Sequence, residues 1–130
     1  MTATIPTTQE LEAFAEEMML WGAPFKTGGR AREGIDCLGV IIEVYRRCGF
    51  SVPDPLSGSR QEVLAHRIMD WFVKVDEPRD LDVFEPEGND LHVGIVIGKM
   101  LLQMTNSGLV YKQHRMRGHG QHYRLKELAE

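Results

Sequence analysis

The run that follows Asp36 and ends before Gly49, CLGVIIEVYRRC, constrains the fold more than any other part of the chain. On a helix, its apolar side chains would cover most of the circumference, which is typical of a helix buried in a protein core. These side chains are Cys37, Leu38, Val40, Ile41, Ile42, Val44 and Tyr45. Asp36 is a favourable N-cap and Gly49 ends the pattern. The sequence therefore predicts one central buried helix that the other elements must cover.

Helices are expected on both sides of this segment, and strands follow them. Residues 8–22 place apolar side chains at a spacing of three to four with Thr8 as the cap, and residues 59–72 predict a third helix. From residue 81 onward, short extended runs alternate with turn residues, and residues 121–125 can add a last strand. This order predicts an α+β fold, in which N-terminal helices and the buried central helix pack on an antiparallel β-meander.

Length and charge restrict the class of protein. A chain of 130 residues predicts a single domain over residues 1–130, with ends at 1–8 and 117–130 that we expect to be flexible or to dock a partner. The net charge of −4 argues against nucleic-acid binding. No apolar run reaches the roughly 18 residues of a membrane span, and the N-terminus lacks the positive leader and apolar core of a signal peptide.

Cys37 is the candidate nucleophile because it stands at the start of the buried helix. Attack on a carbonyl requires the thiolate, whereas a free cysteine with a pKa of about 8.5 is mostly protonated at neutral pH. The backbone N–H groups and macrodipole of a helix N-terminus favour the anion and can also receive an oxyanion. Because free cysteine is often buried, a purely structural Cys37 is the alternative. Cys48, three helical turns further on, is expected to be a core residue that cannot pair with Cys37.

A candidate general base and an orienting group follow in the strand region. His92 opens the apolar run HVGIVIG, where a side chain at the start of a strand can face a cleft. Gln103 interrupts the next run, MLLQMT. Hairpin pairing across Gly98–Lys99 would bring the amide of Gln103 back towards the imidazole, which needs a polar partner to fix its tautomer. The residues therefore predict a papain-like triad of Cys37, His92 and Gln103.

Several motifs in order resemble the NlpC-type cell-wall peptidases, which are small papain-like cysteine endopeptidases of bacteria and their phages. Over roughly residues 10–115, WGAPFKTGGRAREGIDCLGV is similar to the family block with the nucleophile, EPRDLDVFEP to its P-G-D-L strand, and LHVGIVIG to its H-V-G-I strand. The resemblance implies an NlpC-type papain-like fold and a mechanism without metal or cofactor. It also implies that Cys37 is the nucleophile, His92 the general base and Gln103 the orienting residue, usually a histidine.

Three further residues resemble family positions that contact the substrate. Asp36 resembles the aspartate beside the nucleophile, which is associated with the amine end of a stem peptide. Phe25 stands where the family usually has a tyrosine, and Leu38 stands where it often has a serine. Together with Gln103, these departures favour slower catalysis or a changed substrate preference.

The resemblance implies a hydrolase that cleaves amide bonds of peptidoglycan stem peptides, and the expected bond joins γ-D-glutamate to the diamino acid. The form DCLG and the bare domain resemble members carried on phage or prophage tails. This implies tail proteins as partners, synthesis in the host cytoplasm and a final location in the virion tail. One alternative is a catalytically weak or inactive domain that serves as a structural tail hub or plug. Another is a different thiol chemistry, such as amidase or acyl transfer, on the same scaffold.

Two polar clusters are expected to lie in solvent. His114, His119 and His122 occur in a basic segment without an acid or cysteine at ligand spacing, which predicts a solvated or partner-binding tail and no metal site. Acidic residues between positions 76 and 87, including Asp82 and Glu85, alternate with apolar ones. This alternation predicts the solvated face of a strand and its loop.

Overall fold

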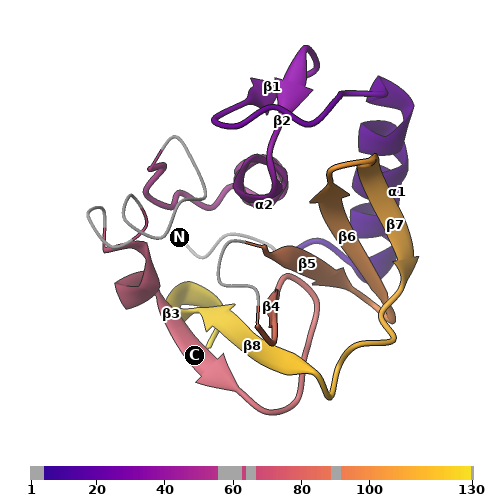
Figure 1. Cartoon of the computed structure of the whole chain (residues 1–130). Coiled ribbons are helices and arrows are strands. Elements are labelled where there is room, and N and C mark those ends of the chain that lie inside the picture. The colour runs from indigo at the N-terminus through magenta and orange to yellow at the C-terminus, as the bar shows by residue number, and fades with distance from the viewer. Residues whose placement is uncertain (1–4, 56–62, 64–66, 89–91, 130) are drawn as a thin grey trace.

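A computed structural model describes residues 5–55, 63, 67–88 and 92–129. The helices are α1 (Thr8–Trp21) and α2 (Cys37–Arg47), with short 3₁₀ helices η1 (Ile68–Trp71) and η2 (Lys126–Leu128). The strands are β1 (Arg30–Ala31), β2 (Gly34–Ile35), β3 (Phe72–Val75), β4 (Val83–Pro86), β5 (Gly94–Ile97), β6 (Met100–Thr105), β7 (Gly108–Gln113) and β8 (Gly120–Leu125). Figure 1 looks along α2 and shows the strands curving around it from β3 to β7, with α1 beside β7.

The central buried helix that the sequence predicts is confirmed as α2. Its side chains are buried on nearly every side, and Val40, Val44 and Tyr45 are 0% exposed. The Tyr45 hydroxyl donates to the carbonyl oxygen of Leu81 at 2.7 Å, so this buried polar group has an acceptor inside the core. α2 packs on β5 and β6 on one side and against β1 on another. It therefore joins the sheet to the β1–β2 hairpin.

The cap of α1 differs from the expected one by a single residue. Thr7 is the N-cap, since its hydroxyl oxygen accepts the Glu10 N–H while the Glu10 carboxylate accepts the Thr7 N–H. Thr8, the predicted cap, instead donates its hydroxyl to Oδ2 of Asp80. The buried face of α1 consists of Leu11, Ala15 and Met18. This face packs against β5 and β7, on the same side of the sheet as α2.

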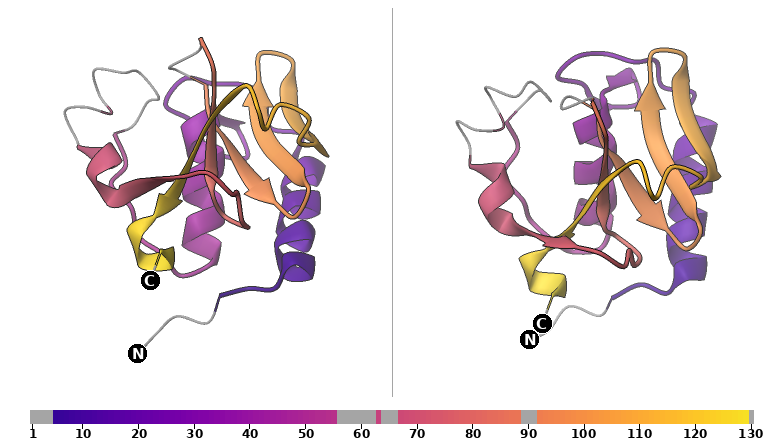
Figure 2. Two further views of the ribbon diagram at one scale, coloured as in Figure 1. Left: turned by 90° about the horizontal axis from the view of Figure 1, so that it is seen from below. Right: turned by 60° about the horizontal axis from the view of Figure 1, so that its bottom comes forward.

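All neighbouring strands of the six-stranded sheet are antiparallel, in the order β3-β8-β4-β5-β6-β7. Strands β4 to β7 form the predicted meander, whereas β8 returns across the molecule and inserts between β3 and β4 (Figure 2). The last strand expected at 121–125 is confirmed as β8, which is hydrogen-bonded on both sides, whereas docking of a partner by residues 117–130 stays a prediction.

The third predicted helix, 59–72, is only partly within the described residues. Positions 59–62 and 64–66 lie outside them, so half of this prediction stays untested. At its end the prediction is wrong, because Ile68–Trp71 form a 3₁₀ turn and Phe72 begins β3. Val73 and Val75 on β3 pair with β8, and this pairing with a distant strand replaces the helical continuation.

His114 and His122 are buried on the outer face of the sheet, so the prediction of a solvated tail is wrong for both, while His119 is exposed. Their Nε2 atoms lie 3.0 Å apart, and both rings contact Phe84. Nδ1 of His114 is buried without a hydrogen-bond partner. If Nε2 of His114 carries the shared proton, no buried N–H lacks an acceptor there. Desolvation, with smaller contributions from the charges of His122 and Arg117, lowers the pKa of His114 to about 4.

Asp82 also departs from the predicted solvated face. Its side chain is 0% exposed, and Arg124 donates to both carboxylate oxygens, from Nε at 2.9 Å and from Nη2 at 2.8 Å. The Arg79 N–H adds a third donor at 2.7 Å. A buried carboxylate is stable when several donors replace its water, and Arg124 supplies the compensating charge. This ion pair connects the start of β4 to β8.

We expect the protein to lose stability in mild acid because of His114. Its pKa in the folded state, about 4, lies below the ordinary value of 6.5, so between these values the unfolded chain binds more protons. The contribution of His114 to the free energy of unfolding should be full above about pH 7 and smaller by on the order of 1 kcal/mol at pH 5. Urea unfolding at pH 7.5 and pH 5 measures the change.

Two variants separate His114 from other titrating groups. His114→Phe should reduce the loss of stability between pH 7.5 and pH 5, because its side chain does not titrate. His119→Gln removes an exposed histidine of the same segment and should leave the loss as in the wild type. An equal loss in the wild type and in His114→Phe contradicts the prediction.

Candidate active site

Cys37 is the first residue of α2, and its sulfur lies among backbone donors. Asp36 caps the helix by accepting the Gly39 N–H at 2.7 Å, while the N–H groups of Cys37 and Leu38 donate towards the sulfur. The N–H of Val93, in the segment that leads into β5, also donates towards it. The thiol therefore lies between the start of α2 and the start of β5.

The pKa of the Cys37 thiol is higher than the sequence predicted. Burial raises the pKa of Cys37 above its ordinary value, the charge of Asp36 raises it further, and the backbone N–H groups lower it by less than this. The N–H groups at the helix N-terminus favour the anion as expected, but Cys37 is only 7% exposed and desolvation outweighs them. A neutral thiol in this position needs a base that accepts its proton.

His92 meets Gln103 across the β5–β6 hairpin. Nε2 of His92 lies 2.5 Å from Oε1 of Gln103. The register places Gly94 opposite Gln103, and a Cβ at position 94 would come within 3.2 Å of the Gln103 Cβ, so glycine leaves room for the amide. An amide oxygen only accepts hydrogen bonds, so Nε2 of the neutral ring carries the proton and Nδ1 is the basic nitrogen. The structure thus brings these two predicted site residues together.

Asp36 is buried, at 3% exposed, and accepts three hydrogen bonds from the chain. Oδ1 accepts hydrogen bonds from the Gly39 N–H and from Nη1 of Arg30, the latter at 2.8 Å, and Oδ2 accepts one from the Gly28 N–H at 2.8 Å. Arg30 also donates to both oxygens of Asp54. These bonds hold the β1–β2 hairpin against the first turn of α2. The expected contact of Asp36 with a substrate amine stays a prediction, since its oxygens here serve donors of the protein.

Backbone segments approach so closely that no side chain fits at two positions, one between α2 and the hairpin and one within the hairpin. A Cβ on Gly39 would lie 2.5 Å from the carbonyl oxygen of Gly29, and a Cβ on Gly29 would lie 2.3 Å from that of Gly34. Both distances are shorter than real Cβ contacts, so the backbones would have to separate. The glycine two residues after Cys37 is therefore required by packing at the start of α2.

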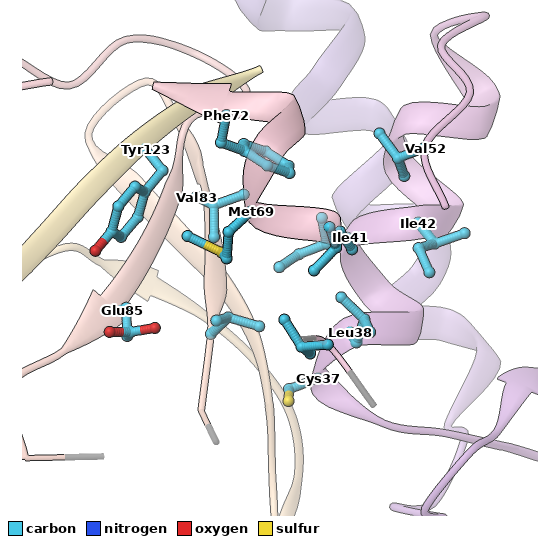
Figure 3. Close-up of a pocket in the computed structure, with 13 residues that line it drawn as sticks. Cys37, Leu38, Ile41, Ile42, Val52, Met69, Phe72, Val83, Glu85 and Tyr123 are labelled. Atoms are coloured by element: carbon cyan, nitrogen blue, oxygen red, sulfur yellow. The ribbon is translucent and has the colours of Figure 1, made fainter. Parts of the chain in front are cut away.

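An apolar pocket extends from Cys37 between α2 and the sheet (Figure 3). The space within it, including open solvent at its mouth, is about 670 Å³. Helix α2 contributes Leu38, Ile41 and Ile42 to the lining. The other apolar lining residues are Val52, Val63, Ile68, Met69, Phe72, Val83 and Val93. Figure 3 shows Glu85 and Tyr123 together on the side of the pocket away from α2.

Leu38 and Phe25, the two residues that differ from the usual family residues near the nucleophile, lie in different surroundings. Leu38 is buried in the pocket wall. Phe25 is 43% exposed and does not belong to the described lining of the pocket, but its backbone pairs with Ile35, just before Asp36. Their roles in placing a substrate stay predictions.

Glu85 is a lining residue that the sequence analysis assigned to a solvated face. Strand alternation in LDVFEP puts Val83 and Glu85 on one face of β4 and Phe84 on the other. Val83 and Glu85 line the pocket, whereas Phe84 belongs to the outer cluster. The alternation was visible in the sequence, but only the fold shows which face meets the pocket.

The described residues contain neither a membrane-spanning helix nor a cluster of metal ligands. No helix there is long and apolar enough to cross a membrane. No three histidine, cysteine, aspartate or glutamate side chains in the same part of the chain are grouped so that they could hold a metal ion.

Comparison with known proteins identifies the family of the chain. The sequence profile of the NlpC/P60 family matches residues 22–127, which include the β1–β2 hairpin, α2 and the whole six-stranded sheet. The chain belongs to the NlpC/P60 family. Members of this family are typically cysteine peptidases that act on the cell wall, and the α+β fold described above is consistent with theirs. Among curated proteins, no sequence matched the chain.

We expect Cys37 of this NlpC/P60 domain to react as a thiol of raised pKa. In a Cys48→Ala background, which removes the second thiol, the rate of alkylation by iodoacetamide should keep rising with pH up to at least about pH 9. Mass spectrometry of the peptide that contains Cys37 measures the rate. A rate that is already constant below pH 7 would contradict the expectation, because it would indicate a stable thiolate–imidazolium pair.

We expect Asp36 to stabilise the NlpC/P60 domain through its three hydrogen bonds. Asp36→Ala removes the cap of α2 and the acceptors of Gly28 and Arg30, so the free energy of unfolding should fall by about 2–4 kcal/mol. Asp36→Asn keeps one acceptor oxygen for the Gly39 N–H and should lose less. Urea unfolding at pH 7.5 measures both, and equal losses would contradict the assigned cap.

Proposed function

We propose that this chain is a peptidoglycan endopeptidase in which Cys37 attacks a stem-peptide amide bond and His92 transfers the protons. The observation that carries the proposal is the hydrogen bond from Nε2 of His92 to Oε1 of Gln103. This bond selects the tautomer whose Nδ1 can accept the proton of a thiol. Membership of the NlpC/P60 family supports the same reaction class and a cell-wall substrate.

The first half of the reaction is acyl transfer to sulfur. The thiol proton of Cys37 passes to Nδ1 of His92 as the sulfur attacks the carbonyl carbon. The backbone N–H groups at the start of α2 stabilise the oxyanion that forms on the carbonyl oxygen. The imidazolium then gives its proton to the leaving nitrogen, the C–N bond breaks, and the acyl group remains as a thioester on Cys37.

The second half returns the enzyme to its resting state. Water attacks the thioester while Nδ1 of His92 accepts one of its protons, and the C–S bond breaks to release the carboxylic acid. The sulfur leaves with the proton that His92 held, so the thiol of Cys37 is restored. Gln103 keeps the ring in one orientation throughout, because its oxygen accepts a hydrogen bond from Nε2–H in both the neutral and the charged ring.

The finer assignments come from the sequence resemblance. The bond between γ-D-glutamate and the diamino acid is the proposed target. Delivery to the wall on a phage or prophage tail, with tail proteins as partners, stays a prediction, and detection of the chain in purified virions by mass spectrometry tests it. A structural tail component without activity is the alternative function.

We expect the purified protein to release muropeptides from sacculi, and Cys37→Ala to release none above background. Cys48→Ala is the matched control, because it removes the other buried thiol, whose pKa burial raises to about 11. Liquid chromatography with mass spectrometry identifies the products and the bond cleaved. Equal release by the wild type and Cys37→Ala would exclude the thiol mechanism, whereas no release by either would favour the structural alternative.

We expect Gln103 to affect turnover more than substrate binding. Gln103→Ala removes the acceptor for Nε2 of His92, so kcat should fall on the order of ten- to a hundredfold with a small change in KM. Gln103→His restores a polar partner and should recover part of the lost kcat. An unchanged kcat in Gln103→Ala would show that the hydrogen bond does not orient the base.

A further inference from the structure

We propose that the pocket beside Cys37 holds a substrate side chain that is aliphatic along its length and ends in an ammonium group, with Glu85 as the carboxylate that receives it. This inference rests on the proposed function, because it names the residue that the peptidase would hold next to the scissile bond. A lysine-type diamino acid in the stem peptide has this chemistry.

The walls of the pocket select an aliphatic chain. Leu38 and Ile41 from α2 lie across from Phe72 and Val83 of the sheet, and the remaining wall is also mostly apolar. Methylene groups move favourably from water into such surroundings. Leu38 carries this apolar wall up to the nucleophile, where a short polar side chain would interrupt it.

The charge in the pocket selects a cation. Among the described residues that line it, Glu85 carries the only formal charge. The effect of this charge reaches Tyr123, since burial first and the Glu85 carboxylate second raise the pKa of the tyrosine. A carboxylate can accept about four hydrogen bonds, so Glu85 can receive an ammonium group while it keeps its interaction within the protein.

The arrangement of the pocket determines where along a bound side chain the methylene groups and the cation must lie. Figure 3 shows Cys37 near the start of α2, Glu85 on the opposite side, and apolar side chains between them. An occupant therefore needs its peptide group at the thiol, methylene groups in the middle and a cation at the end. A neutral alkyl chain would desolvate Glu85 without supplying a compensating charge, and a second carboxylate at the end of the chain would meet a like charge.

The test compares three synthetic stem peptides that differ only in the diamino acid position: L-lysine, L-norleucine and meso-diaminopimelate. Norleucine keeps the alkyl chain without the ammonium, and diaminopimelate adds a carboxylate beside it. The wild type should hydrolyse the lysine peptide with a kcat/KM about tenfold above that of each of the other two. A ratio of one or less to norleucine overturns the proposal.

Two variants at carboxylate positions test whether Glu85 causes the preference for the lysine peptide. Glu85→Gln should bring the lysine-to-norleucine ratio of kcat/KM towards one, because the charge is lost while the size of the side chain is kept. Glu87→Gln makes the same chemical change two residues later, at an exposed position outside the described lining, and should keep the ratio of the wild type. A Glu85→Gln ratio equal to that of the wild type overturns the assignment.

Binding to Cys37→Ala distinguishes this inference from the proposed function. Titration of the three peptides into this variant by isothermal calorimetry should show the tightest binding for lysine, and Glu85→Gln in the same background should abolish the difference. If the wild type hydrolyses none of the peptides while this binding preference holds, the proposed function fails and the pocket assignment stands. If the wild type hydrolyses all three peptides equally well, the proposed function stands and the pocket assignment fails. Equal binding or no binding of the peptides by Cys37→Ala also overturns the pocket assignment.

Discussion

The hydrogen bonds of Asp36 connect the parts of the molecule that must meet for the site to exist. They cap α2, so that Cys37 is its first residue, and they hold Gly28 and Arg30 over the same turn. A buried carboxylate is stable here because three donors replace its water and Arg30 balances its charge. The same bonds make Asp36 part of the scaffold, so a substrate amine would have to compete with donors already in place.

One helix serves both the core and the site, and this has an electrostatic consequence. Because α2 is buried on nearly every side, the thiol at its start is desolvated and its pKa is raised even though backbone N–H groups surround it. The site therefore depends on a base from another element. His92, just before β5, supplies this base. Gln103 on β6 accepts its Nε2–H and so determines which ring nitrogen is basic.

Local patterns predicted the elements that depend on local interactions. The apolar helix after Asp36, the strands from residue 83 to residue 113 and the meeting of His92 with Gln103 follow from helical period, strand alternation and one short hairpin. The strand at Phe72, where a helix was predicted, and the position of the last strand within the sheet depend on distant partners. β3 forms because β8 pairs with it, and β8 itself lies between two strands far earlier in the chain. No pattern in a single segment contains such a pairing.

The sequence by itself determined the buried helix after Asp36, the place of Cys37 at its start and the alternation that puts Val83 and Glu85 on one face of β4. Only the tertiary structure decided which of these groups are desolvated and what they meet. Burial raises the pKa of Cys37. Folding also places Glu85 in the lining of an apolar pocket and brings His114 next to His122. The physical reason is that solvation and electrostatic partners depend on segments that are remote in sequence and adjacent only after folding.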